Sequence, residues 1–170
     1  MVTAARLVAN SECVPASPFC GDSGKAVTGL LAGPASGRPA AGRCAGTPED
    51  AFGPFGRGAP PLRAKIGTGH VLTGVVLSVL DCRPIRGAQV QLWQTNRNGR
   101  YTRATSATVL TNRAGRFRFE GPRPTSYEGR EPHIHIRVIA RFHRPLLARY
   151  VPARGARGGN IRLVLTPEDL

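Results

Sequence analysis

Short apolar segments, each bounded by glycine, proline, asparagine or aspartate, recur through the second half of the sequence. Their β-branched residues and short lengths favour strands over helices. The segments at 71–80, 88–95, 116–120, 133–142 and 160–166 are the expected strands. No segment shows the periodicity of an amphipathic helix of three turns. The pattern therefore predicts an all-β fold, an antiparallel β-sandwich.

The first part of the chain has a different pattern. Residues 1–46 are rich in alanine, glycine, proline and serine and show no sustained periodicity, which is typical of a flexible, irregular leader. Residues 47–170 form the expected sandwich domain. Only Arg6 precedes a short apolar stretch that Asn10 interrupts, so no secretory signal is recognised, and a cytoplasmic location is favoured over export. No apolar run approaches the about 20 residues that a membrane span needs, which excludes a membrane-spanning helix.

The charge of the chain raises the question of nucleic-acid binding. The 170 residues include 24 Lys and Arg against 10 Asp and Glu, giving a net charge of +14. All of the basic residues except Lys25 and Lys65 are arginines, and they are scattered singly among apolar residues. Such spacing is typical of the outward faces of strands rather than of a continuous basic patch. A nucleic-acid partner is therefore not expected.

Four cysteines, Cys13, Cys20, Cys44 and Cys82, are spaced unlike the ligands of any zinc finger or ribbon. Two interpretations remain open at this point. A disulfide could form in the irregular N-terminal third of an exported protein, or all four cysteines could be ordinary thiols.

Two histidines on the fourth expected strand are the first candidate for chemistry. Successive strand residues point to opposite faces, so His133 and His135 share a face, while Ile134 and Ile136 occupy the core face. Side chains at alternate strand positions can converge on one ion, and His-x-His is a recurrent half-site for metals. We expect the two histidines to be a ligand pair.

Two tyrosines accompany the histidine pair. Tyr101 follows the turn at 96–99, and Tyr127 stands six residues before His133. A phenol with an ordinary pKa of about 10 binds metal as a phenolate only when a strongly Lewis-acidic ion displaces its proton. Two tyrosines with two histidines would suit ferric iron better than zinc or a soft metal.

Three stretches carry a resemblance to a known family. The stretches at 87–101 (GAQVQLWQTNRNGRY), 115–119 (GRFRF) and 127–135 (YEGREPHIH) resemble the intradiol ring-cleavage dioxygenases, over about residues 47–170. The resemblance implies a β-sandwich and a non-haem iron(III) centre. It assigns Tyr101, Tyr127, His133 and His135 as the iron ligands and Arg130 as the active-site arginine. Tyr127 would be the tyrosine that leaves the metal and takes up substrate protons.

The resemblance also implies an activity. Such enzymes cleave a catechol-type substrate with O₂ between its two hydroxylated carbons and give a cis,cis-muconate-type diacid. The expected partners are therefore that substrate and O₂, with neither nucleic acid nor membrane, and a homo-oligomer is compatible with the sequence. The alternative is a non-catalytic β-sandwich module that binds carbohydrate, an aromatic polymer or a protein.

Some residues depart from the family pattern or lie outside it. Phe52 stands where an acidic residue is usual, and Arg149 stands where many members carry glutamine. These differences affect the expected substrate rather than the expected metal ligands. His70 and His143 are interpreted as structural or surface residues, and Trp93 as a packing residue.

Overall fold

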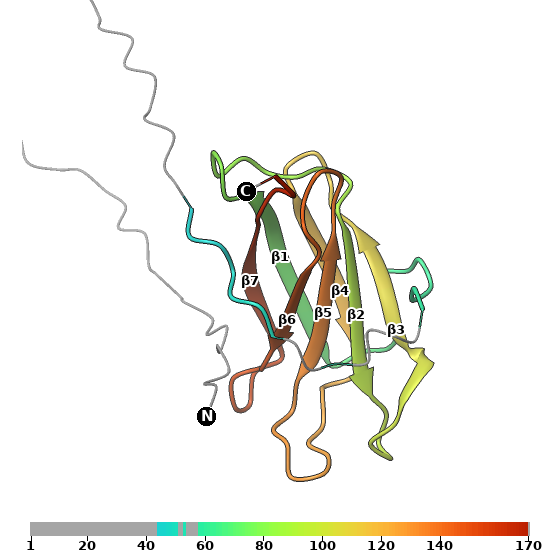
Figure 1. The fold of residues 1–170 in the computed structure, drawn as a ribbon. Coiled ribbons are helices and arrows are strands. Elements are labelled where there is room, and N and C mark those ends of the chain that lie inside the picture. Colours follow the sequence, from blue (N-terminus) through green and yellow to red (C-terminus); the bar gives the residue numbers. More distant parts are fainter. Residues whose placement is uncertain (1–43, 51–52, 54–57, 170) are drawn as a thin grey trace, which may run out of the picture. The chain divides into compact units, whose positions relative to one another are not determined.

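Seven strands form, five of them from the apolar segments identified in the sequence. The computed structural model describes residues 44–50, 53 and 58–169. Its strands, drawn in Figure 1, are β1 (His70–Ser78), β2 (Gln89–Thr95), β3 (Tyr101–Leu110), β4 (Arg116–Gly121), β5 (Ile134–Ile139), β6 (Leu146–Tyr150) and β7 (Gly158–Leu165). No helix long and apolar enough to cross a membrane occurs in this part of the chain. The predicted all-β sandwich is confirmed.

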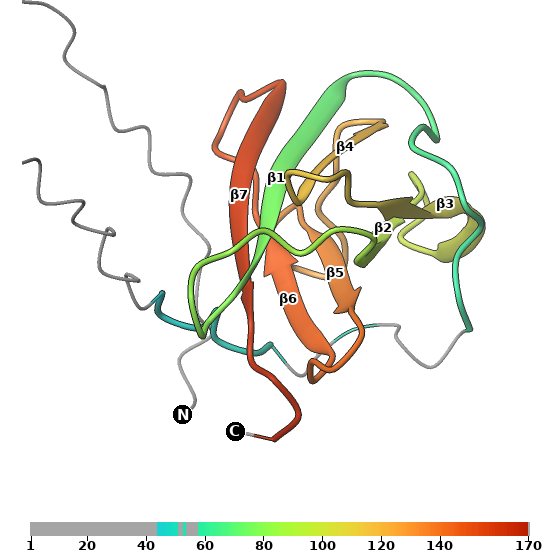
Figure 2. The same cartoon turned by 90° about the horizontal axis from the view of Figure 1, so that it is seen from above.

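The strands form two sheets, which Figure 2 shows as two layers. One sheet has the order β4-β1-β7 and the other the order β3-β2-β5-β6. All pairings are antiparallel as predicted, except that β1 and β7 run parallel, with Val71 opposite Gly158. In the four-stranded sheet β2 and β5 are central, with Trp93 opposite His135.

Alternate residues of the strands fill the space between the sheets. Leu72 and Val76 of β1 are fully buried, as are Leu92 of β2 and Ile136 of β5. Burying one such aliphatic side chain stabilises the fold by about 1.5–3 kcal/mol, so these positions define the core. The opposite residues of β2 and β5 therefore lie on the outer face of the four-stranded sheet, the face on which the candidate ligands were expected.

A polar pair also joins the two sheets within the core. His70 of β1 and Tyr150 of β6 are each about 1% exposed, and His70 Nε2 lies 3.1 Å from Tyr150 Oη. The tyrosine ring packs against Gly159 of β7, where an added Cβ would overlap the hydroxyl. His70 is therefore a buried structural histidine that carries a cross-sheet hydrogen bond.

Two strands and several strand ends differ from the sequence prediction: β1 ends at Ser78 instead of residue 80, and β7 begins at Gly158 instead of residue 160. The strands β3 and β6 were not predicted, because β3 alternates polar side chains with small ones and β6 has only five residues. The strand expected at 133–142 begins at Ile134 and ends at Ile139. Phe142 lies beyond it with a positive φ of 61° and is 66% exposed, so the alternation of the strand does not extend to this residue.

The segment at residues 44–50 is attached to both sheets. Cys44 forms a disulfide with Cys82, which follows β1, so these two cysteines are not ordinary thiols, and the bond reaches into the sandwich instead of lying within the N-terminal third. Cys13 and Cys20 lie outside the described residues. The Thr47 N–H donates to the Val164 carbonyl of β7, and the Asp50 N–H donates to the Leu147 carbonyl of β6. Of the predicted leader, residues 1–43 lie outside the described residues.

Candidate functional site

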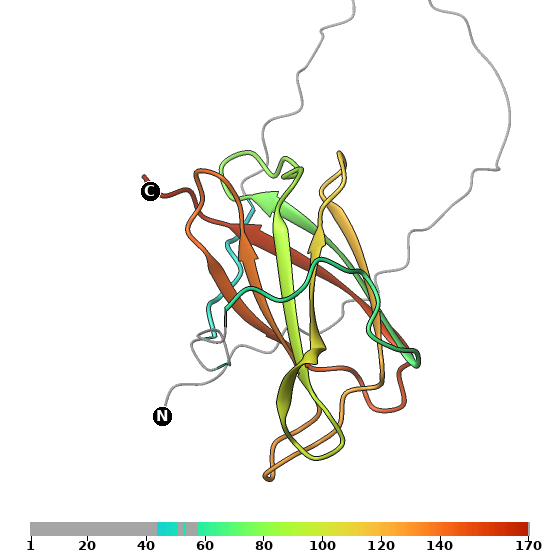
Figure 3. The ribbon, with the colours of Figure 1, turned by 90° about the vertical axis from the view of Figure 1, so that its right-hand side faces the viewer.

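Two loops meet at one end of the sandwich. Figures 1 and 3 show the loop between β2 and β3 and the loop between β4 and β5 projecting from the same end. The first loop leads into Tyr101, and the second contains Tyr127 and ends at His133. Residues from distant parts of the sequence are therefore brought together here.

The loop between β2 and β3 is a tight turn. The Asn96 side-chain carbonyl accepts hydrogen bonds from the N–H groups of Asn98 and Arg100, at 2.9 and 3.0 Å. Gly99 has a φ of 71°, a conformation that glycine adopts without strain. An added Cβ at Gly99 would lie 3.3 Å from Cβ of Tyr127, so this turn packs closely on the second loop.

A second tight turn links Tyr127 to Arg130. The N–H of Arg130 donates to the Tyr127 carbonyl at 2.8 Å, and Glu128 and Gly129 between them have φ values of 48° and 73°. Two successive positive φ values are typical of a type I′ turn, for which glycine at the second position is well suited. The guanidinium carbon of Arg130 lies 5.9 Å from the centre of the Tyr127 ring. The turn thus places the predicted active-site arginine beside a predicted ligand.

The two histidines lie on the outer face of the four-stranded sheet, as their alternation predicted, but neither is exposed to solvent. His133 is 4% and His135 is 3% exposed. His133 Nδ1 lies 2.6 Å from the carbonyl oxygen of Glu131, which orients the ring and directs Nε2 away from the backbone. Such a hydrogen bond to the second nitrogen is typical of metal-binding histidines.

The four predicted ligands converge. The hydroxyl oxygens of Tyr101 and Tyr127 lie 2.6 Å apart, and Tyr101 Oη lies 3.4 Å from His133 Nε2. His133 Nε2 in turn lies 3.2 Å from His135 Nε2. All four residues that the sequence singled out, with Arg130 beside them, are therefore brought together in one cluster, which we call the Tyr/His cluster.

Burial controls the protonation of the Tyr/His cluster. It is the main cause of a lowered pKa for His133, and it lowers the pKa of His135 to about 4, with His133 as the next contribution. Both imidazoles are therefore neutral at neutral pH, the form that binds metal. Burial, followed by the hydrogen bond between the hydroxyl groups of Tyr101 and Tyr127, raises the pKa of the Tyr101 hydroxyl. Tyr101 would thus ionise at neutral pH only if a strong Lewis acid replaced its proton.

The geometry of the Tyr/His cluster fits a single metal ion. Metal bonds to nitrogen and oxygen ligands are about 2.0–2.2 Å long, so the ligand atoms around one ion lie about 3 Å apart. The three separations in the cluster, 2.6, 3.2 and 3.4 Å, are of this size. Within the described part of the chain, no group of three His, Cys, Asp or Glu side chains is placed to hold a metal ion. The two phenolic oxygens would therefore have to complete the ligand set, which suits a hard ion such as Fe(III).

A second arginine lies close to the Tyr/His cluster. Arg149 of β6 lies directly opposite His135 in the sheet, and its Nε is 3.0 Å from Oδ2 of Asp50. The sequence marked Arg149 only as a departure from the family pattern and did not identify Asp50. No local pattern links two residues so far apart in the chain, although the position of Arg149 in alternation with Tyr150 indicates an outward-facing residue.

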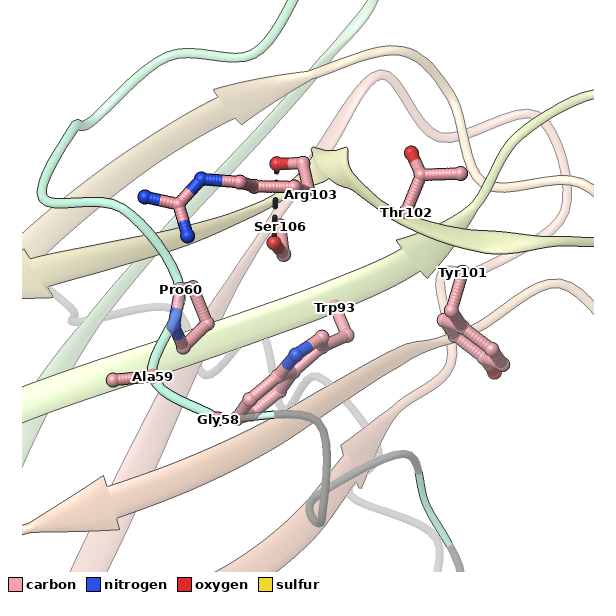
Figure 4. Close-up of a pocket in the computed structure, with 8 residues that line it drawn as sticks. All are labelled: Gly58, Ala59, Pro60, Trp93, Tyr101, Thr102, Arg103 and Ser106. Carbon is pink, nitrogen blue, oxygen red and sulfur yellow. Dashed lines mark hydrogen bonds between the residues drawn. The ribbon is translucent and has the colours of Figure 1, made fainter.

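A pocket of about 300 Å³ adjoins the Tyr/His cluster. Figure 4 shows Trp93 and Tyr101 pointing to the same side of their strands, into this pocket. It is lined by Gly58, Ala59, Pro60, Trp93, Tyr101, Thr102, Arg103 and Ser106. The guanidinium of Arg137 lies 5.6 Å from the Trp93 ring, so Trp93 packs against its neighbour and also forms a wall of the pocket.

The remaining candidates lie away from the Tyr/His cluster. His70 is in the core, and His143 Nε2 lies 3.2 Å from Ser78 Oγ near the opposite ends of the strands. Both are therefore structural residues. Phe52 lies outside the described residues.

Comparison with known proteins identifies the family and the fold. A family model described as "Dioxygenase" matches residues 60–149, which is more than half of the chain. A comparison with curated proteins found no match.

Solved structures with the same fold include an intradiol ring-cleavage dioxygenase from Tetranychus urticae, with 22% identity and a TM-score of 0.63, covering 74% of this chain and 96% of that one. The dioxygenase domain of a dioxygenase carbohydrate-binding protein fusion from Streptomyces sp. SirexAA-E has 21% identity and a TM-score of 0.60, covering 72% and 97%. Hydroxyquinol 1,2-dioxygenase from Pseudomonas putida DLL-E4 has 18% identity and a TM-score of 0.60, covering 72% and 67%.

Proposed function

Because the chain belongs to the dioxygenase family and has the fold of intradiol ring-cleavage enzymes, we propose that it is a non-haem iron(III) dioxygenase acting on a catechol-type substrate. It would cleave the aromatic ring between the two hydroxylated carbons with O₂ and give a cis,cis-muconate-type product. The observation that carries this proposal is the convergence of two phenolic oxygens and two imidazole nitrogens at 2.6–3.4 Å.

Tyr101, Tyr127, His133 and His135 would hold the iron. Bound Fe(III) would supply Lewis acidity, so that the phenols ionise and a catechol binds as its dianion. His133 is held for this role by the Glu131 carbonyl. The chain contains three tyrosines, and two of them lie in this cluster, whereas Tyr150 is buried between the sheets.

The residues around the iron ligands have distinct proposed roles. Tyr127 lies on a loop rather than on a strand, so it can move with less disturbance of the sheet than Tyr101, the first residue of β3. Tyr127 Oη would accept a proton that the substrate loses on binding. The guanidinium of Arg130 stays charged at any working pH and would stabilise negative charge that develops on the substrate ring.

The test is aerobic incubation of the iron-reconstituted protein with a panel of catechols, following oxygen uptake and the visible spectrum together. Tyrosinate bound to iron(III) should colour the protein, and a bound catechol should shift the band. Full iron occupancy without colour or oxygen uptake would refute the proposal and favour a non-catalytic binding module.

A matched pair of tyrosine variants assigns the ligands. Tyr127→Phe should weaken the visible band and lower the rate of oxygen uptake, because one phenolate donor is lost. Tyr150→Phe removes the same hydroxyl from the core and should change only the stability, by about 1 kcal/mol for one buried hydrogen bond. If Tyr150→Phe weakened the band and Tyr127→Phe left it unchanged, the assignment of Tyr127 as an iron ligand would be wrong.

A further inference from the structure

An ion pair with a buried carboxylate lies next to the Tyr/His cluster. Nε of Arg149 is 3.0 Å from Oδ2 of Asp50, and the two side chains are 22% and 7% exposed. Arg149 is the cross-strand partner of His135. Directly opposite residues of neighbouring strands point to the same face, so the arginine side chain starts beside a proposed iron ligand.

The backbone holds the carboxylate of this pair in place. The Asp50 N–H donates to the carbonyl of Leu147, two residues before Arg149 on β6, at 2.9 Å. Upstream, Thr47 is bound to Val164 of β7 both through its N–H and through its side-chain hydroxyl. Asp50 is therefore fixed independently of its ion pair, and it restricts the directions in which the Arg149 side chain can point.

The ion pair leaves part of the guanidinium available. Arginine has five N–H donors, and the contact with Asp50 is made through Nε. Among the described residues no acceptor is seen for the two terminal nitrogens of Arg149, which remains partly open to solvent. Paired terminal N–H groups of this kind match the two oxygens of a carboxylate.

The two arginines near the Tyr/His cluster come from different elements of the fold. Arg130 lies over the ring of Tyr127, on the loop between β4 and β5. Arg149 lies beside His135, on the edge strand β6. A substrate bound at the cluster by its two hydroxyl groups could thus meet one guanidinium near the reacting atoms and the other elsewhere on its ring.

We propose that Arg149, oriented by Asp50, binds an anionic ring substituent, so that the protein prefers a catechol carrying a carboxylate over catechol itself. This inference rests on the proposed function and narrows its substrate class. Arg149 is the binding residue in this account, and Asp50 is a positioning residue that acts through it.

The test measures binding rather than turnover. Iron-loaded protein is titrated anaerobically with catechol and with 3,4-dihydroxybenzoate, and dissociation constants are obtained from the visible band shift and from calorimetry. The wild type should bind the carboxylated compound more tightly. Arg149→Gln should reduce this preference about tenfold or more, the size expected for a lost hydrogen bond to a charged group, and should leave catechol affinity nearly unchanged.

Further variants distinguish the effect of the orientation of Arg149 from the effects of its charge and of protein folding. Asp50→Asn should lower the preference by a smaller factor, because Arg149 remains but loses its fixed direction. Arg149→Lys keeps the positive charge but lacks the planar guanidinium, so it should give a preference between those of the wild type and Arg149→Gln. This variant also tests the proposal if Arg149→Gln does not fold. The control Arg118→Gln removes an equal charge from β4 in the other sheet, where Arg118 pairs with Glu120, and should leave the preference unchanged.

The outcomes separate this inference from the proposed function. If catechol binds and shifts the band but the carboxylate brings no advantage, the inference is wrong and the dioxygenase proposal stands. It is equally wrong if the preference survives in both Arg149 variants or falls as much in Arg118→Gln. If the iron-loaded wild type binds neither compound, the proposed function fails, and the inference fails with it.

Discussion

The disulfide between Cys44 and Cys82 offers a stability prediction whose size follows from the structure. The double variant Cys44→Ser/Cys82→Ser removes the cross-link and changes little else, since serine is close to cysteine in size. The variant is best made in a Cys13→Ser/Cys20→Ser background, so that any response to reductant reports on the Cys44–Cys82 bond alone.

The magnitude can be worked from the length of the closed loop. The bonded cysteines are separated by 38 residues. In the chain-entropy account, a cross-link over a loop of this length lowers the entropy of the unfolded chain by about 13 cal/mol/K, which is about 4 kcal/mol at 25 °C. Unfolding entropies are about 2.1 cal/mol/K per residue, so for the 120 residues that the structure describes the loss corresponds to about 15 °C in Tm.

The assay is thermal unfolding followed by circular dichroism, with and without a thiol reductant. The parent protein should lose about 15 °C of Tm on reduction, and the double serine variant should already melt at the lower temperature and not respond to reductant. Mass measurement after alkylation confirms whether the two cysteines are bonded in the sample.

A small effect would refute the reasoning. If the alkylated mass shows the bond in the parent, yet the double variant melts within about 2 °C of it, the cross-link does not restrict the unfolded chain as calculated. If the parent protein is fully alkylated without reduction, the bond itself is absent.

Three further predictions concern single residues. Gly129→Ala puts a side chain at a φ of 73° in the turn that carries the second cluster tyrosine, so it should cost about 1–2 kcal/mol and weaken the visible band of the iron-loaded protein. Gly155→Ala, at a φ of 82° in another loop, should cost as much stability without changing the band. If the two variants weakened the band equally, the turn at Gly129 would not be what positions Tyr127. Gly159→Ala should cost about 1–3 kcal/mol in denaturant unfolding by overlapping the Tyr150 hydroxyl, and Tyr150→Phe should recover part of that loss. Burial is the main cause of the lowered pKa of His70. Below pH 6.5 the unfolded state therefore binds a proton at this residue that the folded state does not bind, and the free energy of unfolding decreases as the pH is lowered. In metal-free protein, His70→Gln should flatten this fall by at most about 1.4 kcal/mol per pH unit, and an unchanged slope would show that His70 is not buried as described.

The Tyr/His cluster could be predicted because its members carry local signals. Strand alternation placed His133 and His135 on one face, and the short turns before Tyr101 and after Tyr127 contain glycines where the backbone needs them. The resemblance then supplied the order of the four residues. The structure adds that their polar atoms meet, which depends on the β2–β3 hairpin loop and the β4–β5 loop, which connects the two sheets, projecting from the same end of the sandwich.

The ion pair and the disulfide could not be predicted in the same way. Asp50 and Arg149 lie at opposite ends of the domain sequence, and their pairing follows from residues 44–50 running along the edges of β7 and β6. Likewise, nothing in the spacing of the cysteines favoured Cys44 with Cys82, because disulfide pairing depends on distance in the folded chain. The strand β3 escaped prediction for a related reason, since its polar outward residues resemble a loop until β2 pairs with it.

The parallel pairing of β1 with β7 has a consequence for how the protein is made. As a ribosome releases the chain, β1 emerges first, but its partner strand appears only when Gly158–Leu165 has left the exit tunnel. Until then one edge of β1 stays open, and contacts between segments so distant in sequence form slowly. We therefore expect ribosome-bound chains that end before β7 to remain protease-sensitive and prone to aggregation, and the Tyr/His cluster to assemble only after translation has passed that strand.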